Sequence, residues 1–162
     1  TTYPKPKWLP LDIISDTPEK MLNELKALSN DEIDAWVHSA AVLDYVVESP
    51  AEGKLASQQG PLNVKLVESP KHILELKDKC KDSVRIGFKL ETGIKQKELV
   101  RRAVAQLEYA GMTAVIANRL EDLTDANRPR AYLVDKTGAD FTLESMLDVC
   151  EAISTVIDRG NR

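Results

Sequence analysis

A strand, a helix and a second strand follow one another near the start of the chain, and this succession leaves few folds open. Leu11–Ser15 is apolar enough for a short strand. A helix is predicted from Thr17 onward, because its hydroxyl can cap free N–H groups, Pro18 fits the first helical position and Glu19 falls in the first turn. Ile33–Val42 is predicted as the next apolar strand. This order predicts a βαβ unit with parallel strands and a right-handed crossover.

The periodicity of apolar residues in the rest of the chain predicts further strands and helices, and together they indicate an α/β domain. Leu62–Val67 alternates strictly between apolar and polar side chains, as half-exposed antiparallel strands do. Lys97–Ala110 has apolar residues at helical spacing and is followed by Gly111, a residue suited to the position after a helix. The other predicted elements are a helix that begins near Ser69 and extends to Cys80, strands at Val84–Leu90, Met112–Ala117, Ala131–Val134 and Asp140–Leu143, a hairpin turn at Asp135–Ala139, and a final helix at Leu143–Arg159.

The chain is long enough for a substantial core, and we predict a single α/β domain over residues 1–162. Its sheet is mostly parallel, with an antiparallel strand and a hairpin added. Residues 45–61 show no periodicity and contain Pro50, Gly53 and Gly60, so they are predicted to form a long flexible flap.

Charge and composition narrow the possible partners and location. The net charge is −4, with basic and acidic residues intermixed, which argues against nucleic acid as a partner. The chain has two cysteines, Cys80 and Cys150, no signal-peptide core and no run of about 18 apolar residues. We therefore predict a cytoplasmic protein with free thiols and no membrane contact.

Two strand ends predict where a ligand binds. Trp36–Asp44 changes from apolar residues to small ones and then to a carboxylate, and Arg85–Thr92 also ends in polar groups. In open α/β sheets, ligands bind outside the carboxyl ends of the strands. These two ends are therefore predicted to form the floor of a site.

Four candidate residues follow the first of these ends in the chain, three of them close to it and one in the flap, and each has two interpretations. Ser39 and Ala40 leave room for a planar ring to lie against the main chain, or they belong to a strand packed tightly under a helix. Asp44 could bind a ribose hydroxyl or a metal ion, or it is a solvated loop residue. Lys54, beside Gly53 in the flap, could close over phosphate groups, or it is an ordinary surface lysine.

Phe88 and Asn118 also have two interpretations each. Phe88 could stack on a base or fill the core. Asn118 ends an apolar strand and could hold a substrate amide or carboxylate, or cap the turn. His72, near a helix start, is predicted at the surface. The sequence contains no glycine-rich dinucleotide or phosphate-loop fingerprint, no paired metal-ligand spacing and no nucleophile elbow.

Six short segments, taken in their order and separation, resemble the phosphopantothenate–cysteine ligase family, of the DNA/pantothenate metabolism flavoprotein C-terminal type. The segments are Ser39–Tyr45, Gly53–Leu55, Gly60–Leu62, Ser69–Lys71, Gly87–Thr92 and Ile116–Asn118. The resemblance covers residues 11–158. It implies a Rossmann-like, mostly parallel sheet with helices on both faces. It also implies a homodimer, whose contact is built by the strand Leu62–Val67 and the hairpin near Tyr132, in keeping with their half-exposed patterns.

The resemblance implies a ligase that joins 4'-phosphopantothenate to cysteine in coenzyme A biosynthesis. CTP or ATP, accompanied by Mg²⁺, activates the substrate carboxylate and releases pyrophosphate, after which the cysteine amine displaces the nucleoside monophosphate. Lys54 would neutralise phosphate charge from the mobile flap. The implied nucleotide-binding residues are Ser39, Ala40, Asp44, Lys54, Pro70, Lys71 and Phe88, the implied catalytic residues are Lys54 and Asn118, and no residue is implied as a metal ligand.

The chain departs from this family in two places. The family's first βαβ portion, with its glycine-rich turn, has no counterpart, which predicts either a fragment or a separate chain that supplies that segment. The chain alone is then expected to lack full ligase activity. Bacterial members carry lysines near the end of the helix Lys97–Ala110, where Gln106 and Ala110 stand here, so CTP versus ATP stays open. The alternative is a non-catalytic dimerisation or regulatory module with the same fold.

Overall fold

A computed structural model gives the fold of the chain and describes residues 15–29, 32–57, 60–138 and 140–160. The elements, in chain order, are α1 (Pro18–Leu28), β1 (Ala35–His38), β2 (Tyr45–Val47), β3 (Leu66–Glu68), α2 (His72–Glu75), β4 (Val84–Glu91), α3 (Gln96–Ala110), β5 (Ala114–Arg119), the 3-10 helix η1 (Asp122–Thr124), β6 (Ala131–Asp135), β7 (Asp140–Leu143) and α4 (Met146–Gly160). The strand predicted at Leu11–Ser15 lies outside the described residues except for its last position.

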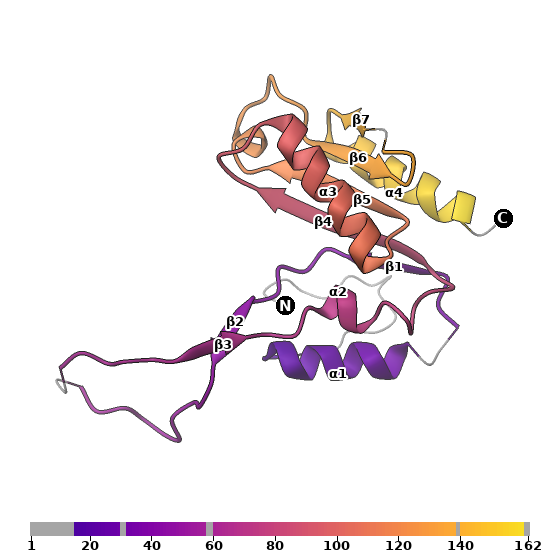
Figure 1. Cartoon of the computed structure of the whole chain (residues 1–162). Helices are drawn as coiled ribbons and strands as arrows, with labels where there is room; N and C mark the ends of the chain where they lie inside the picture. Colours follow the sequence, from indigo (N-terminus) through magenta and orange to yellow (C-terminus); the bar gives the residue numbers. More distant parts are fainter. Residues whose placement is uncertain (1–14, 30–31, 58–59, 139, 161–162) are drawn as a thin grey trace.

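Five strands form one sheet in the order β1-β4-β5-β6-β7. β1, β4 and β5 are parallel, with Val37 opposite Ile86 and Phe88 opposite Ile116. β6 is antiparallel to β5, and β7 is antiparallel to β6, which confirms the predicted hairpin. β2 and β3 form a separate antiparallel pair at the base of an arm, residues 48–57 and 60–65, that extends away from the body (Figure 1).

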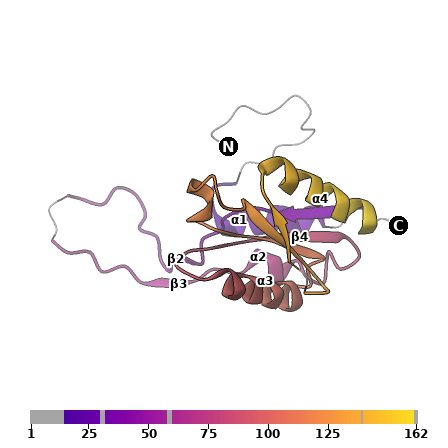
Figure 2. The ribbon, with the colours of Figure 1, turned by 90° about the horizontal axis from the view of Figure 1, so that it is seen from above.

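Helices cover both faces of the sheet, as predicted (Figure 2). α3 packs Leu99 and Leu107 into a buried cluster that includes Val115 of β5. On the opposite face, α4 packs against a cluster that contains Ile86 and Ile116. Successive strand residues point to opposite faces, so Val115 packs on the α3 side of the sheet and its neighbour Ile116 packs on the α4 side.

Two helix ends follow local chemistry that the sequence predicts. The Thr17 hydroxyl accepts a hydrogen bond from the Lys20 main-chain N–H at 3.2 Å, and Pro18 opens α1. α3 ends at Gly111, which has a φ of 63°, and the Met112 N–H donates back to the Leu107 carbonyl at 2.9 Å. A left-handed residue at this position satisfies carbonyls that the last helical turn leaves free.

Replacing Gly111 by alanine is expected to lower the free energy of unfolding by about 1–2 kcal/mol, because a side chain in the left-handed region approaches the following carbonyl. A Cβ at this position would also lie 3.2 Å from Cε of Lys77. The control is Gly111→Asn, which adds the same Cβ but tolerates the left-handed region better. Urea unfolding of the three proteins measures the difference, and equal stability of the alanine and asparagine variants would contradict the argument.

α2 is shorter than the predicted helix, which extended to Cys80. In an α-helix the Lys77 N–H would donate to the Ile73 carbonyl, four residues earlier. It donates instead to the Leu74 carbonyl at 3.0 Å. The Ile73 carbonyl accepts from the Arg85 guanidinium at 2.7 Å, so a residue of β4 occupies the group that would continue the helix.

β1 and the arm also differ from the predictions. β1 ends at His38 and not at Val42, because the Ser39 N–H donates to the Val37 carbonyl at 3.2 Å, which turns the chain out of the sheet. β2 lies inside the predicted flap, 45–61. The antiparallel strand predicted at Leu62–Val67 is present as β3, but it is shorter and shifted, since only Leu66 and Val67 of the predicted range are paired. Val67 is partly buried, whereas Leu62, Val64 and Leu66 are exposed because β3 pairs with β2 away from the helices.

The half-exposed pattern predicted for the hairpin holds only for its outer strand. Tyr132 of β6 is 3% exposed, because β6 lies between β5 and β7 and both of its faces are covered by helices. Phe141 of β7, at the edge of the sheet, is 52% exposed. The dimer contact assigned to this hairpin stays a prediction.

Candidate functional site

A cavity of about 310 Å³ opens where β1 leaves the sheet. His38, the last residue of β1, pairs with Gly87, so the edge of β4 beyond Gly87 has no neighbour on this side. α1, α2 and the second half of α3 supply the other walls. Residues on the wall include Met21 and Leu25 of α1, Ile73 of α2, Gln106 and Tyr109 of α3, and Phe88 and Lys89 of β4. This volume is typical of small-molecule sites.

Most of the predicted nucleotide-binding residues line this cavity together. They are Ser39, Ala40, Asp44, Pro70, Lys71 and Phe88. The prediction that the carboxyl end of β1 contributes to a site therefore agrees with the position of the cavity. On β4, however, the lining residues lie before the strand end, because β1 stops opposite Gly87.

Phe88 contributes to two environments. It lines the cavity, yet it also packs against the buried cluster under α4. Gly87, one residue earlier, faces α3: a Cβ there would lie 2.9 Å from Nε2 of Gln106. Because strand side chains alternate, the ring of Phe88 points toward α4 and its main chain faces the cavity. Stacking of this ring on a base stays a prediction.

Lys54 and Asn118 do not line the cavity. Lys54 is exposed in the arm, which stands away from the body (Figure 1). Asn118 lies within β5, opposite Leu90, and not in the turn after it. It shares a sheet face with Ile116, which belongs to the cluster under α4, so it faces away from α3.

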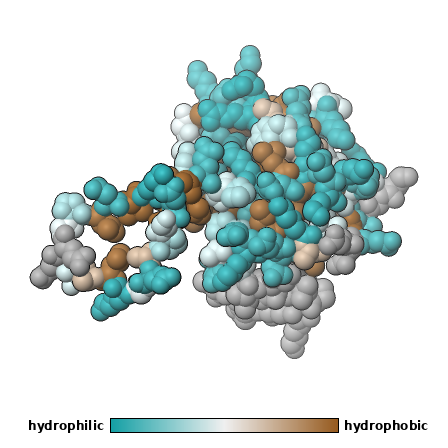
Figure 3. Space-filling view, turned by 60° about the horizontal axis from the view of Figure 1, so that its bottom comes forward, coloured by the Kyte–Doolittle hydropathy of each residue, from teal (hydrophilic) through white to brown (hydrophobic). Residues whose placement is uncertain are grey.

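The arm carries apolar side chains on its surface. Figure 3 shows apolar surface where the arm joins the body and along its length. The exposed apolar residues are Leu55, Leu62 and Val64 in the arm, and Tyr45, Val47 and Leu66 in the β2–β3 pair at its base. Contiguous exposed apolar surface of this kind typically marks an interaction site.

The sequence prediction for His72 was wrong, because this residue is buried and lines the cavity at 5% exposure. The spacing of His72, Leu76 and Cys80 is four residues, and all three side chains are buried. Residues at this spacing share a face of a helical segment, so the buried Leu76 and Cys80 face could have indicated the position of His72. Ser69 and Gln106 are also buried cavity residues that were not selected as site residues.

Both histidines of the chain face the cavity, and both are held neutral. The pKa of His38 is lowered to about 4, chiefly by burial and then by electrostatic interaction with Arg85 and His72, since protonation of one imidazole disfavours protonation of the other. Burial also lowers the pKa of His72, although the main chain of Pro18 opposes the shift. The rings of Trp36 and His38 stack at 6.1 Å between centroids with an interplanar angle of 11°, which fixes the plane of the imidazole.

Arg85 joins two walls of the cavity, α2 and the end of α3, from inside the protein. It is 1% exposed, and its guanidinium donates to the Ala110 carbonyl at 2.6 Å and to the Ile73 carbonyl at 2.7 Å. It therefore links the end of α3 to α2. A cation near the last carbonyls of a helix is favourable because those carbonyls carry partial negative charge.

Gln106 reaches the sheet because Gly87 has no side chain. Its Nε2 donates to the Phe88 carbonyl at 3.3 Å, across the space that a Cβ on residue 87 would occupy. Gln106 is thereby held against the strand with part of its amide in the cavity wall.

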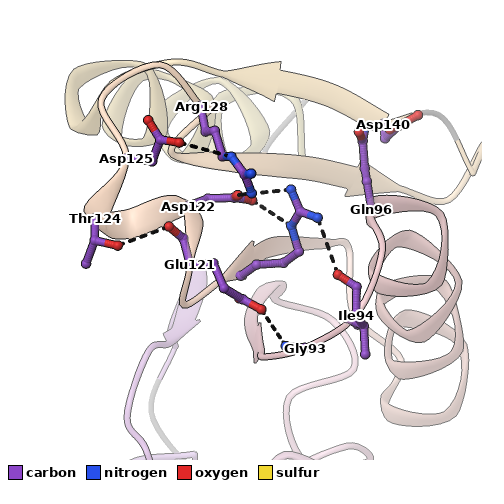
Figure 4. Close-up of polar contacts among 10 residues, drawn as sticks. Gly93, Ile94, Gln96, Glu121, Asp122, Thr124, Asp125, Arg128 and Asp140 are labelled. Atoms are coloured by element: carbon purple, nitrogen blue, oxygen red, sulfur yellow. Dashed lines mark hydrogen bonds and ion pairs between the residues drawn. The ribbon is translucent and has the colours of Figure 1, made fainter.

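A second polar cluster lies at the carboxyl ends of β4 and β5, outside the cavity (Figure 4). Asp122 accepts two hydrogen bonds from Arg119, at 2.7 and 2.9 Å, and one from Arg128 at 3.1 Å. Arg119 also donates to the Ile94 carbonyl at 3.3 Å, and the Glu121 carboxylate accepts from the Gly93 N–H. The cluster ties the loop after β5 to the loop after β4.

The described residues contain no group of three or more His, Cys, Asp or Glu side chains placed to hold a metal ion. None of the helices within the described ranges is long and apolar enough to cross a bilayer.

The fold is an α/β domain with a cavity beside its parallel strands. The chain belongs to the family described as the DNA/pantothenate metabolism flavoprotein C-terminal domain, whose model matches residues 11–159. A coenzyme A biosynthesis bifunctional protein of Methanocaldococcus jannaschii is 42% identical over 104 residues, which are 64% of this chain and 25% of that protein. Phosphopantothenate–cysteine ligase 2 of Oryza sativa is 39% identical over 90 residues, which are 54% of this chain and 27% of that protein.

Solved structures of low sequence identity share the fold. The DNA/pantothenate metabolism flavoprotein from Streptococcus pneumoniae matches with a TM-score of 0.69 at 21% identity, over 86% of this chain and 70% of that one. Cab2 in complex with phosphopantothenate-cysteine matches with a TM-score of 0.67 at 20% identity, over 90% of this chain and 51% of that one. The chain spans about a quarter of the length of the curated relatives it matches, 25% to 29%.

Proposed function

We propose that this chain forms the nucleotide-binding part of a phosphopantothenate–cysteine ligase in coenzyme A biosynthesis. The observation that carries the proposal is the cavity at the end of β1, where Ser39, Ala40, Asp44 and Lys71 lie together. The names of the relatives supply the reaction, because they refer to coenzyme A biosynthesis and to the ligation of phosphopantothenate with cysteine. The remaining parts of the active site would come from outside this chain.

The proposed reaction has two steps. A carboxylate oxygen of 4'-phosphopantothenate attacks the α-phosphorus of CTP or ATP, pyrophosphate leaves and an acyl-nucleotidyl anhydride forms. The amine of cysteine then attacks the acyl carbon, loses a proton and expels the nucleoside monophosphate. Each step leaves negative charge on phosphate oxygens, so cationic side chains near the phosphates stabilise the transition states.

The cavity residues divide into a ring-binding side and a charged side. The small residues Ser39 and Ala40 allow a flat base to approach the main chain, and Phe88 and Pro70 line the same space. Lys71 is exposed at the cavity and makes no ion pair with any described residue, so its ammonium is available to a phosphate.

Asp44 is the residue that would hold the nucleotide and its Mg²⁺. It is the one carboxylate among the described residues that line the cavity. Protein sites for Mg²⁺ commonly supply only one or two carboxylates, and the phosphates and water complete the coordination. When bound, Mg²⁺ would neutralise charge on the triphosphate. The donor set therefore fits an ion that arrives with the nucleotide.

The proposed catalytic roles of Lys54 and Asn118 require more than the cavity of one chain. Lys54 would reach phosphate groups only if the arm folds over a cavity, either its own or that of a second copy. A homodimer joined by the arm is supported by the apolar side chains that the arm exposes. Asn118, on the α4 side of β5, would contact the acyl part of the substrate at the carboxyl edge of the sheet.

The second candidate function is a non-catalytic dimerisation or regulatory module. It is favoured by one observation, the exposed position of Lys54 in the arm, away from the cavity. The ligase proposal instead requires a glycine-rich βαβ segment, supplied by a longer protein or by a separate chain. Nucleotide binding separates the two candidates.

Calorimetric titration with CTP and with ATP, each with Mg²⁺, tests the proposal. Wild type is expected to bind at least one of them, and Lys71→Ala is expected to weaken binding by about tenfold, because a charge-assisted hydrogen bond to a phosphate is lost. Lys97→Ala is the control, since Lys97 is exposed and does not line the cavity. Absence of binding by wild type would overturn the proposed function.

A further inference from the structure

Three side chains in the cavity wall carry buried polar atoms that have no hydrogen bond of normal geometry to any described residue. The atoms are Nε2 of His38, Oγ of Ser69 and both ring nitrogens of His72. Ser69 is 7% exposed and His72 is 5% exposed, and all three residues line the cavity. They come from the end of β1, from the turn after β3 and from the start of α2.

Buried polar atoms without a hydrogen-bond partner are unusual and need an explanation. Buried polar groups in folded proteins are nearly always hydrogen-bonded, because an unsatisfied group loses its contacts with water and gains none. The neighbours of His72 on the same face are Leu76 and Cys80, which offer it no polar partner. The main chain of Pro18 interacts with the imidazole electrostatically, but no hydrogen bond of normal geometry joins them. One further buried atom without a partner, Nε of Arg85, belongs to a guanidinium that already donates two hydrogen bonds and does not line the cavity. The other four atoms line one cavity, and a ligand that satisfies them is the best explanation for them.

The chemistry of these three side chains restricts the ligand. Both imidazoles are neutral, so each presents one N–H donor and one lone-pair acceptor, and the Ser69 hydroxyl is also both donor and acceptor. None of these three side chains carries a charge that would attract a phosphate or a carboxylate, and the nearby Arg85 guanidinium is 1% exposed and bound to main-chain carbonyls. Trp36 and Ile73 supply apolar surface beside it. A flat, uncharged group with donors and acceptors on its edge matches all of these features.

The charged residues of the cavity complete the argument. Asp44, Lys71 and Lys89 also line it, and Asp44 and Lys71 are exposed. Lys89 makes an ion pair with Glu91 at 3.0 Å. A ligand with an uncharged ring at one end and phosphates at the other can therefore place the ring against the buried group and the phosphates toward the lysines.

We propose that His38, Ser69 and His72 are the specificity-determining residues that recognise the edge of the nucleobase. This inference rests on the proposed function, because it assigns the base of the bound nucleotide to a particular part of the same cavity. The three residues are called the base-recognition group below. The stacked Trp36 ring holds the His38 imidazole in place, so the group presents its donors and acceptors in a fixed arrangement.

Variants of the base-recognition group should change selectivity and not only affinity. In Ser69→Ala and His72→Leu, the ratio of the affinities for CTP and ATP is expected to change by about fivefold, the effect of one neutral hydrogen bond. Lys71→Ala is the matched control, because a phosphate contact is shared by both nucleotides and its loss should weaken both equally. An unchanged ratio in both variants of the group would overturn the inference.

Stability distinguishes recognition from a structural role. If His72 serves the ligand, His72→Leu removes two unsatisfied buried atoms and the urea midpoint stays the same or rises. If His72 serves the fold, the midpoint falls, and that result would count against the inference.

A measurement on wild type needs no variant. The chain has only two histidines, so their imidazole NMR signals are easily followed. Saturating CTP or ATP is expected to shift both signals, and Lys71→Ala should require more nucleotide for the same shift. Nucleotide binding that leaves both signals in place would overturn the inference while the proposed function survives. Absence of nucleotide binding would overturn both.

Discussion

Replacing Asp122 by asparagine is expected to lower the free energy of unfolding by about 3 kcal/mol. The Asp122 side chain is 1% exposed and pairs with Arg119, whose side chain is 17% exposed. Asparagine keeps the shape but removes the charge, so the Arg119 guanidinium would remain largely buried without its counter-ion. The loss of one partner of a buried ion pair is costly for this reason.

Urea unfolding measures this effect, and Asp125→Asn is the matched control. Asp125 pairs with Arg128 at 3.1 Å, but both side chains are more than two-fifths exposed, at 42% and 48%. Solvent screens such pairs, so the control is expected to lose less than about 1 kcal/mol. Similar losses in the two variants would show that burial does not set the strength of the Asp122 pairs.

The sequence predicts those parts of the fold that local patterns determine. The spacing of Leu99, Ala103 and Leu107 marks the buried side of α3, and Gly111 marks its end. The Thr17 cap marks the start of α1 in the same way. Parallel pairing of β1, β4 and β5 then follows, because helices connect strands of this kind.

The sequence does not predict features that depend on residues far apart in the chain. α2 ends early because Arg85, twelve residues after Ile73, takes its carbonyl. Asp122 lies between the predicted strands Met112–Ala117 and Ala131–Val134, in a segment with several acidic residues, and composition cannot show which of their carboxylates is buried. The direction in which the arm extends is also not predicted by the local sequence.

The same distinction between local patterns and distant contacts explains why the sequence predicted only some of the residues that line the cavity. Ser39, Ala40 and Asp44 follow β1 directly, so the rule that ligands bind at strand ends was sufficient to place them. His72 was assigned to the surface because a histidine near a helix start is usually solvated. Its burial depends on the packing of α2 against α1 and Trp36, which the local pattern does not contain.

Lowering the pH from 7 to 4.5 is expected to reduce the free energy of unfolding by about 2 kcal/mol through His38 alone. The ordinary pKa of histidine is 6.5, whereas His38 in the folded chain has a pKa of about 4. Between these values the unfolded chain binds a proton that the folded chain does not. The contribution of neutral His38 to the free energy of unfolding is therefore fully present above pH 6.5 and is lost as the pH falls toward 4. His72, whose pKa is also lowered, adds to the loss in the same direction.

This pH window belongs to the two histidines. The carboxylates whose pKa is lowered, such as Glu91 and Glu98, start from an ordinary value of 4.5 and titrate below the window. The groups that face His38 are Arg85 and His72, and both oppose its protonation. A loss of folding stability that begins near pH 6 is therefore due to the histidines. A loss that begins only below pH 4.5 is due to the carboxylates.

His38→Phe is the variant that tests this assignment, because phenylalanine keeps an aromatic ring beside Trp36 and cannot titrate. Urea unfolding at pH 7, 5.5 and 4.5 should show a loss for wild type that is about 2 kcal/mol larger than the loss for the variant. His72→Leu should also reduce the loss, and the double variant should remove most of it. Identical pH dependence in wild type and His38→Phe would mean that the imidazole is protonated as easily in the folded chain as in the unfolded one. The cavity beside β1 would then be open to water, and not the dry neutral wall that base recognition requires.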